Sequence, residues 1–294
     1  MANSPTVLIT GAGSGLGLAS GLHLASLGYR VFGTVLTDGE AAAMGAAAQA
    51  RGVQMTPIPC DITKSDQIRS ACRDLFSQTS RLDALVHFAG LGLRGFFEDL
   101  GMDEIRKVYD VNVFGAMELT QAILPYMREQ RSGRIIITSS AAGRMGAMSI
   151  SGYSSSKFAL EGWGECLAPE VRGFNIFVSM LEPGLIATPH FQVNRNRARK
   201  AKDPASPYFN WFVQHEHIVD GILERAQFSI EDVAALVHRI LTAKSPKLRY
   251  MIGRKAKMLT GIRRYTPFDL FDRIYWPIVR RVVTSPKKQA SGLS

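Results

Sequence analysis

Tyr153 and Lys157 are separated by three serines in the segment SGYSSSKFAL, residues 151–160. On a helix, side chains four positions apart lie one above the other on the same face. A neighbouring ammonium group favours the phenolate form and so lowers the pKa of a tyrosine from its ordinary value near ~10. The spacing suits a proton-transferring base with its activator, although it is equally compatible with an ordinary solvated helix face.

A glycine-rich turn near the start of the chain has the pattern of a nucleotide-binding loop. The apolar run TVLIT (6–10) leads directly into TGAGSGLG (10–17), and a helical pattern follows. Glycines allow a tight turn and a close approach of backbone to a pyrophosphate, and the helix that follows presents N–H groups to the anion. The same glycines could form a plain strand-to-helix turn, but a place after the first strand of a βαβ unit is the context that dinucleotide binding requires.

The elements that would position these groups alternate along the chain. Short β-branched runs are separated by Ala-, Leu- and charge-rich segments of helical length, which predicts an α/β fold: a Rossmann-type, doubly wound parallel sheet. Near-continuous apolar runs such as RIIIT fit strands covered on both faces. No linker or repeat divides the chain, so we expect a single dinucleotide-binding catalytic domain over 1–253. The expected strands are 6–10, 30–35, 53–58, 84–90, 134–140, 176–184 and 247–253.

Composition and charge restrict the class of protein. The 294 residues are 46% hydrophobic and 20% charged, as in a globular protein with a sizeable core. Three cysteines without metal-ligand spacing indicate reduced thiols, a cytoplasmic protein and no metal site. The first residues lack a signal-peptide pattern, and no apolar run approaches the ~20 residues that span a bilayer. The net charge of +10 is concentrated in a basic amphipathic extension, 254–294.

The glycine spacing T-G-x-x-x-G-x-G, formed by Gly11, Gly15 and Gly17, resembles that of the short-chain dehydrogenase/reductase family. The resemblance covers most of residues 5–253, and further motifs follow in the family's order. They are CDI at 60–62, VNVFG at 111–115, SS at 139–140, YSSSK at 153–157 and EPGLIAT at 182–188. The resemblance implies an oxidoreductase and favours the catalytic interpretation of Tyr153 and Lys157.

The family pattern implies a catalytic role for four residues. Tyr153 would exchange the proton of the alcohol while hydride moves between substrate and nicotinamide. Lys157 would lower the tyrosine pKa and hold the nicotinamide ribose, Ser140 would stabilise charge on the substrate oxygen, and Asn112 would position Lys157. The implied cofactor contacts are Gly11, Ser14, Gly15, Leu16, Gly17, Leu36, Asp38, Asp61, Ile62, Ala89, Gly90, Tyr153, Lys157, Pro183, Gly184, Ile186 and Thr188.

One motif departs from the family pattern. Where relatives usually carry N-N-A-G after the fourth strand, this chain has HFAG at 87–90. Ala89 and Gly90 still allow the adenosine ribose to pass closely. His87 could be an additional acid or base, but a histidine at the end of a buried strand is more often a hydrogen-bonded core residue, and we expect the latter.

The end of the second strand normally selects between NAD and NADP. An acid there bonds the ribose 2′-hydroxyl and repels a 2′-phosphate, whereas an arginine binds the phosphate. Here Val35 and Leu36 occupy the deciding places in GTVLTDGE (33–40), Asp38 follows, and Ser14 stands where many NADP-using relatives carry a basic residue. Burying a phosphate dianion without a cation is costly. We therefore expect NAD, with NADP as the alternative.

After Thr188 the chain contains a long segment in which a substrate lid is expected at about 189–228. It holds Phe191, an aromatic cluster PYFNWF (207–212) and a basic run RNRARKAK (195–202). An apolar lid suits an apolar ligand, but the aromatic residues could equally pack the segment onto the core. GTVLTDGE and PKLRYMIGRKAKML also resemble the hydroxysteroid and retinol dehydrogenase branch. That favours a small hydrophobic secondary or allylic alcohol, or its ketone, as the substrate.

Three other interpretations fit parts of the sequence. An NADPH-dependent ketoreductase would differ at the cofactor ribose. A nucleotide-sensing protein on a dehydrogenase fold would be expected to have lost Ser140, Tyr153 or Lys157, and all three are present. A nucleic-acid binder is suggested only by the basic extension, which carries no base-reading motif, so no nucleic-acid partner is expected. A homodimer or homotetramer is the family expectation.

The basic extension also carries an aromatic stripe at helical spacing. It lies between an expected helix start at Thr266 and Pro267 and an expected end or kink at Pro277, and its members are Phe268, Phe271 and Tyr275. Aromatic stripes flanked by Arg and Lys can lie on an anionic membrane surface, which would make the protein peripherally membrane-associated. The stripe could instead pack on the main domain or on a neighbouring subunit.

Overall fold

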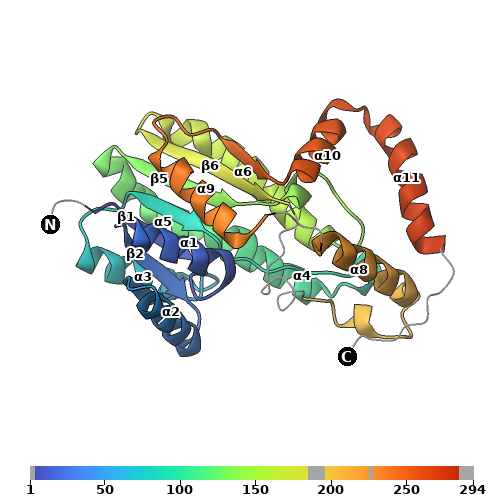
Figure 1. The fold of residues 1–294 in the computed structure, drawn as a ribbon, viewed down its shortest axis with the longest axis horizontal. Coiled ribbons are helices and arrows are strands. Elements are labelled where there is room, and N and C mark those ends of the chain that lie inside the picture. Colours follow the sequence, from blue (N-terminus) through green and yellow to red (C-terminus); the bar gives the residue numbers. More distant parts are fainter. Residues whose placement is uncertain (1–3, 185–195, 225–227, 285–294) are drawn as a thin grey trace.

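The computed structural model describes residues 4–184, 196–224 and 228–284 (Figure 1). Its central feature is a sheet of seven strands in the order β3-β2-β1-β4-β5-β6-β7, and all neighbouring strands are parallel. The strands are β1 (Thr6–Thr10), β2 (Arg30–Val35), β3 (Met55–Pro59), β4 (Ala84–His87), β5 (Gly133–Thr138), β6 (Ile176–Pro183) and β7 (Arg249–Ile252).

Helices cover both faces of this sheet, which confirms the doubly wound prediction. The apolar side chains on each face form a separate core cluster with the helices that cover it. One face is covered by α1 (Gly15–Ser26), α2 (Asp38–Ala50) and α9 (Ile230–Thr242). The other is covered by α3 (Ser65–Gln78), α5 (Gly115–Gln130) and α6 (Ser151–Arg172). The sheet is therefore buried on both sides, as the near-continuous apolar strands required.

The order of the strands reverses at β1. The chain moves outward from β1 through β2 to β3, then returns to the other side of β1 to build β4 to β7. In doubly wound sheets, ligands bind in the crevice outside the carboxyl ends of the strands at such a switch point. Thr10 and His87, the last residues of β1 and β4, are paired there, so the loops after these two strands meet.

Five of the seven expected strands have different bounds in the structure, and the largest difference is at β4. This strand ends at His87 rather than at residue 90. The backbone N–H groups of Phe88 and Ala89 leave the strand ladder and donate hydrogen bonds of 3.1 and 3.0 Å to the Thr10 hydroxyl. A side chain at the end of β1 therefore shapes the loop after β4.

Side-chain and helix-end hydrogen bonds explain other differences. β3 begins at Met55 rather than at 53 because the Val53 N–H still bonds to Ala48 of α2, at 3.0 Å. β5 ends at Thr138 rather than at 140 because the Ser140 hydroxyl caps a short turn, Ala141–Gly143. β5 begins one residue earlier than expected, β6 ends one residue earlier, and β7 is shorter at both ends.

The C-terminal extension forms two helices, α10 (Arg254–Tyr265) and α11 (Phe268–Thr284), where the sequence analysis expected one. Pro277 was expected to end or kink the helix, and the first alternative is wrong, since α11 continues through it. Proline removes one backbone donor, and the carbonyl left without it belongs to the exposed Arg273, which water can reach. No helix among the described residues is long and apolar enough to cross a membrane.

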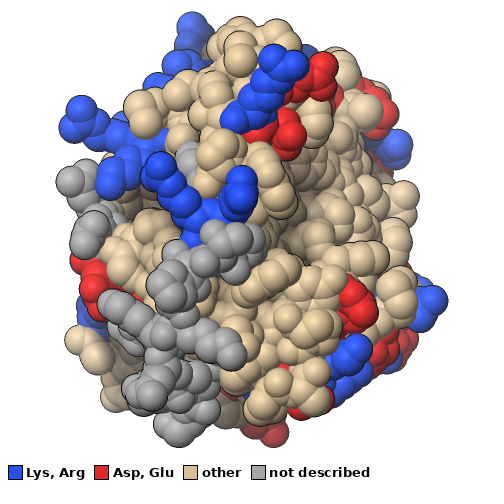
Figure 2. Space-filling view, turned by 90° about the vertical axis from the view of Figure 1, so that its right-hand side faces the viewer, with Lys and Arg blue, Asp and Glu red and all other residues tan. Residues whose placement is uncertain are grey.

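The remaining long helices are α4 (Met102–Tyr109) and α8 (Phe209–Leu223). α8 and α11 pack together at one end of the molecule, with α10 beside them (Figure 1). Figure 2 views this end and shows Lys and Arg side chains gathered toward its upper left, next to a broad area without charged residues.

Candidate active site

Tyr153 and Lys157 lie on one face of α6 near its first residue. The Lys157 Nζ is 5.7 Å from the centroid of the Tyr153 ring, as the four-residue spacing predicted. Only 5% of Lys157 is exposed, and its ammonium donates a hydrogen bond of 2.8 Å to the carbonyl of Thr138, the last residue of β5. This bond fixes the start of α6 to the carboxyl edge of the sheet.

The pKa values of this pair differ from the expectation. Burial raises the pKa of Tyr153, and a hydrogen bond with the Ser140 side chain lowers it only in part. Burial also lowers the pKa of Lys157 to about 8, while Glu161 opposes that shift. The net pKa of Tyr153 therefore lies above its ordinary value, because burial disfavours the phenolate more than Ser140 favours it. The lowering of that pKa by Lys157 stays a prediction.

Ser140 links the tyrosine to the segment after β6. Its hydroxyl accepts a hydrogen bond of 3.1 Å from the Ala142 N–H and lies 3.4 Å from the Pro183 carbonyl, to which it donates. It also lowers the pKa of the Tyr153 side chain, which places the two side chains near each other. The predicted catalytic serine thus lies between the tyrosine and the proline-glycine segment. Ser140 also has a structural role, because its hydroxyl caps the 141–143 turn.

Asn112 lies in a wide, π-helical turn, Asp110–Phe114, between α4 and α5. Its Oδ1 accepts a hydrogen bond of 2.7 Å from the Leu91 N–H, and its Nδ2 donates to the Leu91 carbonyl and to Ser156 Oγ, both at 3.0 Å. A Cβ on Gly90 would lie 3.3 Å from Asn112 Oδ1 and 3.7 Å from Lys157 Nζ. Asn112 therefore borders the lysine and holds the residue before it, Ser156, which the sequence analysis did not single out.

The glycine loop has the backbone that its sequence predicts. Gly11 and Gly15 have φ angles of +66° and +53°, in the left-handed region that favours glycine. A Cβ on Gly11 would lie 2.9 Å from the backbone of Ala89, and one on Gly17 would lie 2.2 Å from the Gly11 carbonyl oxygen. The loop, the start of α1 and the segment after β4 thus pack closely at glycine positions where a side chain would not fit, as expected of a loop that approaches a pyrophosphate with backbone N–H groups.

The other predicted cofactor contacts near the glycine loop lie on different elements and differ in the burial and hydrogen bonding of their side chains. Ser14 precedes the first residue of α1 and has an extended backbone, with Leu16 in the first helical turn. Asp61 Oδ1 accepts hydrogen bonds from the Thr63 N–H and hydroxyl, at 2.9 and 2.7 Å. The Ile62 side chain is buried in the core, so only its backbone is available to a nucleotide.

A carboxylate that the sequence analysis missed lies at the end of β2. Glu40 Oε2 accepts a hydrogen bond of 2.8 Å from the Leu36 N–H, and a Cβ on Gly13 would lie 3.0 Å from the same oxygen. Asp38, by contrast, is exposed in the first turn of α2. The pattern Thr-x-x-Glu, in which Thr37 caps α2 and Glu40 folds back, was the signal that could have identified it.

The proline-glycine segment is described up to Gly184. Pro183 is buried at the end of β6, and the Gly184 N–H donates a hydrogen bond of 2.9 Å to the Ile252 carbonyl. The predicted contacts Ile186 and Thr188 lie outside the described residues, as does Phe191 of the expected lid. The described part of the lid consists of residues 196–224.

The aromatic cluster of the lid packs onto the main domain. Phe212 is fully buried with Leu93 and Leu100, and Tyr208 stacks on Phe96 with ring centroids 5.0 Å apart. Trp211 contacts both of those rings edge-on. The packing alternative is confirmed for these residues.

Two arginines of the basic run in the lid are ion-paired with other elements. Arg197 lies 3.1 Å from Glu216 of α8, and Arg199 lies 2.8 Å from Asp103 of α4. These charges hold the described part of the lid in place and are not directed at a ligand.

His87 is a core residue, as expected. It is buried at the end of β4, and its Nε2 lies 2.9 Å from the Thr120 hydroxyl. Burial lowers its pKa to about 3, so the imidazole is neutral at physiological pH.

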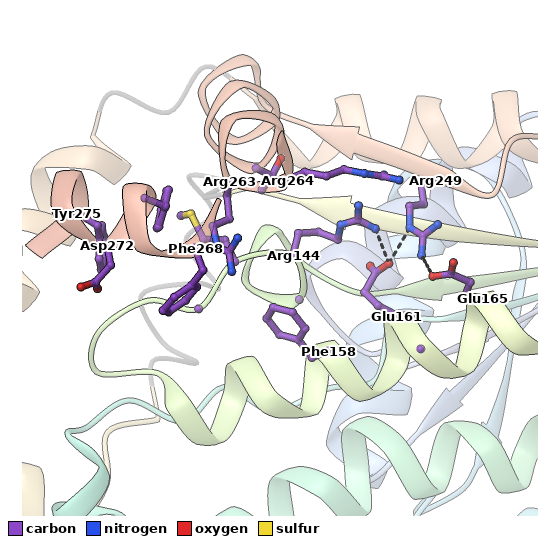
Figure 3. Close-up of a pocket in the computed structure, with 16 residues that line it drawn as sticks. Arg144, Phe158, Glu161, Glu165, Arg249, Arg263, Arg264, Phe268, Asp272 and Tyr275 are labelled. Atoms are coloured by element: carbon purple, nitrogen blue, oxygen red, sulfur yellow. Dashed lines mark hydrogen bonds and ion pairs between the residues drawn. The ribbon is translucent and has the colours of Figure 1, made fainter. Parts of the chain in front are cut away.

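A buried acid pair behind Lys157 was not foreseen. Glu161, one turn further along α6, lies 3.4 Å from Arg144 and 3.0 Å from Arg249 (Figure 3). Glu182, next to Pro183, lies 3.7 and 3.4 Å from the same two arginines. Burial, followed by the charge of Glu161, raises the pKa of Glu182 to about 7. The cluster joins the loop that carries Ser140, the helix of Lys157 and strands β6 and β7.

The sequence is similar to those of known proteins. Residues 5–199 match the family model described as short chain dehydrogenase. A 3-ketodihydrosphingosine reductase of Bacteroides thetaiotaomicron is 33% identical over 253 residues, which cover 86% of this chain and 89% of that protein. Retinol dehydrogenase 8 of Bos taurus is 32% identical over 279 residues, which cover 91% of this chain and 88% of that protein.

The fold is also similar to that of a solved short-chain dehydrogenase. The crystal structure of a short-chain dehydrogenase from Streptomyces avermitilis is similar with a TM-score of 0.78 at 27% identity, and the match covers 97% of this chain and 98% of that one. The region that matches the family model contains the glycine loop and the four predicted catalytic residues.

Proposed function

Since the chain belongs to the short-chain dehydrogenase family, we propose that it is an NAD-dependent oxidoreductase. It interconverts a hydrophobic secondary or allylic alcohol and the corresponding carbonyl compound by reversible hydride transfer. The observation that carries the proposal is the meeting of Ser140, Tyr153 and Lys157 at the carboxyl end of β5, in a chain whose glycine loop packs its backbone against Ala89.

The two hydroxyl groups handle the substrate oxygen. Ser140 lies close enough to Tyr153 to lower the pKa of the tyrosine, so an oxygen placed against both hydroxyl groups would receive a hydrogen bond from each. During alcohol oxidation Tyr153 accepts the hydroxyl proton, and during carbonyl reduction it returns it. Ser140 stabilises the charge that develops on the same oxygen. A bound nicotinamide supplies or accepts the hydride.

Lys157 provides the positive charge that this chemistry needs. Burial raises the pKa of Tyr153, so a phenolate forming there must be stabilised by a cation nearby. The Lys157 ammonium, 5.7 Å from the ring centroid, is that cation, and with a pKa of about 8 it remains largely charged at neutral pH. We also assign to it the nicotinamide ribose, with Asn112 and Ser156 holding this part of α6 in position.

The choice of NAD over NADP rests on the end of β2. Leu36 is 62% exposed and occupies the place of a phosphate-binding arginine, while its N–H is bonded to the Glu40 carboxylate. A 2′-phosphate brought to this position would meet a negative charge and no cation, which is unfavourable. The ribose hydroxyls of NAD would meet a hydrogen-bond acceptor instead.

An NADP-dependent carbonyl reductase is the second candidate. It is favoured by the similarity to a protein named as a reductase, at 33% identity, whereas the similarity to a retinol dehydrogenase favours the alcohol. Both names denote apolar substrates. A homodimer or homotetramer remains our expectation, and Phe114 and Tyr126, which are 57% and 40% exposed, would give a second copy apolar surface near α5.

The test is a screen of apolar alcohols and ketones with NAD and NADP, in which the absorbance of the reduced nicotinamide is followed. We expect turnover of at least one alcohol with NAD, and its loss in the Tyr153→Phe variant. Turnover restricted to NADPH and ketones would favour the second candidate. Binding of NAD without turnover of any compound would favour a nucleotide-sensing role and contradict the proposal.

A further inference from the structure

The two C-terminal helices, defined here as the C-terminal arm (254–284), expose an unusual amount of apolar surface. No residue of α10 is buried. Eight large hydrophobic side chains of the arm are between 45% and 84% exposed: Met258, Leu259, Ile262, Tyr265, Phe268, Leu270, Ile274 and Trp276. Contiguous apolar patches on soluble proteins mark surfaces that bind a partner or a membrane.

Part of the aromatic stripe does pack inward. Phe271 and Tyr275 stack on each other with centroids 5.6 Å apart and line a cavity of about 640 Å³ between the arm and α6 (Figure 3). Leu270 and Ile274 are also one turn apart but lie on a different side of α11. The packing alternative therefore accounts for one side of the helix and leaves the other side apolar and exposed.

The arm also has the charge that an anionic surface requires. Between residues 254 and 281 it carries eight Lys or Arg and two acids, Asp269 and Asp272. Among the described residues, no carboxylate forms an ion pair with the exposed Lys255, Lys257 or Arg273. Cations and exposed apolar side chains thus occur together on both helices, which is the composition of helices that lie in a membrane interface.

The neighbouring helix extends the surface. α11 packs against α8, on which Trp211, Ile218 and Ile222 are 38%, 43% and 47% exposed. The three helices lie at the same end of the molecule (Figures 1 and 2). Since no described helix could span a bilayer, such a surface would lie on the membrane and not cross it.

We propose that the C-terminal arm docks this end of the protein onto an anionic lipid bilayer, with α10 and α11 lying in the interfacial plane. The cations contact lipid headgroups, and the exposed apolar side chains enter the boundary between headgroups and acyl chains. The packing of α11 on α8 and of α10 on β7 keeps the arm attached to the main domain. The proposal is independent of which cofactor or substrate the active site takes.

The test is co-sedimentation with vesicles of phosphatidylcholine containing about one third phosphatidylserine. We expect binding at low salt, little binding to pure phosphatidylcholine, and release in high salt because ions screen the attraction. The variant Lys255→Gln/Lys257→Gln/Arg273→Gln removes three cations. Each is worth about a factor of five in affinity at such a surface, so the variant should bind roughly 100-fold more weakly.

Matched controls distinguish the contribution of the arm to vesicle binding from that of the overall positive charge. Arg51→Gln/Arg69→Gln/Arg128→Gln removes the same charge from exposed positions on other elements and should bind vesicles within about threefold of the wild type. Ile262→Ser/Ile274→Ser should weaken binding while leaving the net charge unchanged. An unchanged circular dichroism spectrum and melting temperature show that the variants fold.

Two results would overturn the proposal. One is the absence of binding to anionic vesicles at low salt. The other is a concentration-dependent increase in molecular mass by light scattering that the Ile262→Ser/Ile274→Ser variant abolishes, because a second copy of the chain would then cover the arm. Quenching of Trp276 fluorescence by brominated lipids, lost in part in Trp276→Phe, would support insertion directly.

Discussion

The Glu40 carboxylate accepts a hydrogen bond of 2.8 Å from the backbone N–H of Leu36, and so places a negative charge at the end of β2. We expect the wild type to prefer NAD over NADP by at least ~10-fold in kcat/KM, the ratio that ~1.4 kcal/mol produces. Leu36→Arg should shift the preference toward NADP by about the same factor, because a guanidinium binds a phosphate with two hydrogen bonds.

Two further variants define the cause of that preference. Glu40→Gln keeps an acceptor for the Leu36 N–H but removes the charge, and should improve the use of NADP without impairing that of NAD. Leu27→Arg adds the same charge at another exposed position and should leave the cofactor ratio unchanged. A wild type that prefers NADP would refute the role given to Leu36 and Glu40.

Tyr153→Phe should lower kcat by at least ~100-fold, the low end for loss of a general acid–base group. The substitution removes only the hydroxyl, so the fold and the affinity for NAD should be retained. The measurement is steady-state kinetics together with a fluorescence titration of NAD. Tyr126→Phe, on the exposed face of α5, is the matched control and should retain full activity. Near-normal turnover in Tyr153→Phe would show that another group moves the proton.

His87→Asn should make the protein less sensitive to acid. Burial lowers the pKa of His87 to about 3, below the ordinary value of ~6.5 that it has in the unfolded chain. The unfolded state therefore binds a proton first as the pH falls, and the stability provided by the neutral imidazole is lost between about pH 6.5 and 3. Melting temperatures at pH 7 and pH 5 should differ less in His87→Asn than in the wild type.

The same measurement on His217→Asn serves as the control, because His217 is exposed on α8. We expect its melting temperatures to change with pH as in the wild type. Activity should persist in His87→Asn, since His87 is hydrogen-bonded to Thr120 in the core and is assigned no part in the reaction. A loss of activity with an intact fold would reopen its role as an acid or base.

Glu182→Gln should become relatively more stable as the pH rises. Burial raises the pKa of Glu182 to about 7, above its unfolded value of ~4.3. The unfolded state loses the proton first, so the wild type loses stability from about pH 4.3 up to 7, and glutamine removes that loss. The difference in free energy of unfolding between variant and wild type, measured in urea at pH 5 and pH 8, should favour the variant more at pH 8.

Glu165 provides a control of opposite sign in the same cluster. Its hydrogen bond with Arg249 lowers the pKa of the carboxyl group, so its contribution to stability is present at neutral pH and is lost as the pH falls. Glu165→Gln should therefore be destabilised relative to the wild type more at pH 8 than at a pH below ~4, where the unfolded carboxyl group is protonated. If the stability of both variants relative to the wild type changed in the same direction with pH, the assignment of a raised pKa to Glu182 would be wrong.

Most of the correct predictions came from patterns within a single strand or helix. The seven strands are short apolar runs, and the Tyr153–Lys157 contact follows from helical spacing within one element. Positions that depend on two distant elements were missed. Glu182 and Glu161 come from β6 and α6, and only the packing of that helix on the sheet brings their carboxylates to the same arginines.

Strand and helix ends were predicted less well for a related reason. β4 ends early because the Thr10 side chain from another strand takes up the next two N–H groups. α11 passes through Pro277 although proline is a reliable stop signal in sequence, because the helix is exposed and water can replace the missing donor. In both cases the deciding partner lies outside the segment itself.

α4, the wide turn at Asp110–Phe114 and α5 follow one another without a break and form one helical rod, 102–130. The wide turn determines how far α4 is rotated about the helix axis relative to α5. An α-helix advances by about 100° for each residue, so the extra residue in this turn rotates α4 relative to α5. The same rod can then present one face to α6 through α4 and another to the sheet through α5. Deleting a single residue here would remove the rotation between the two halves and turn Asn112 away from Leu91 and Ser156. The length of this turn is therefore as necessary to the position of Asn112 as its amide side chain.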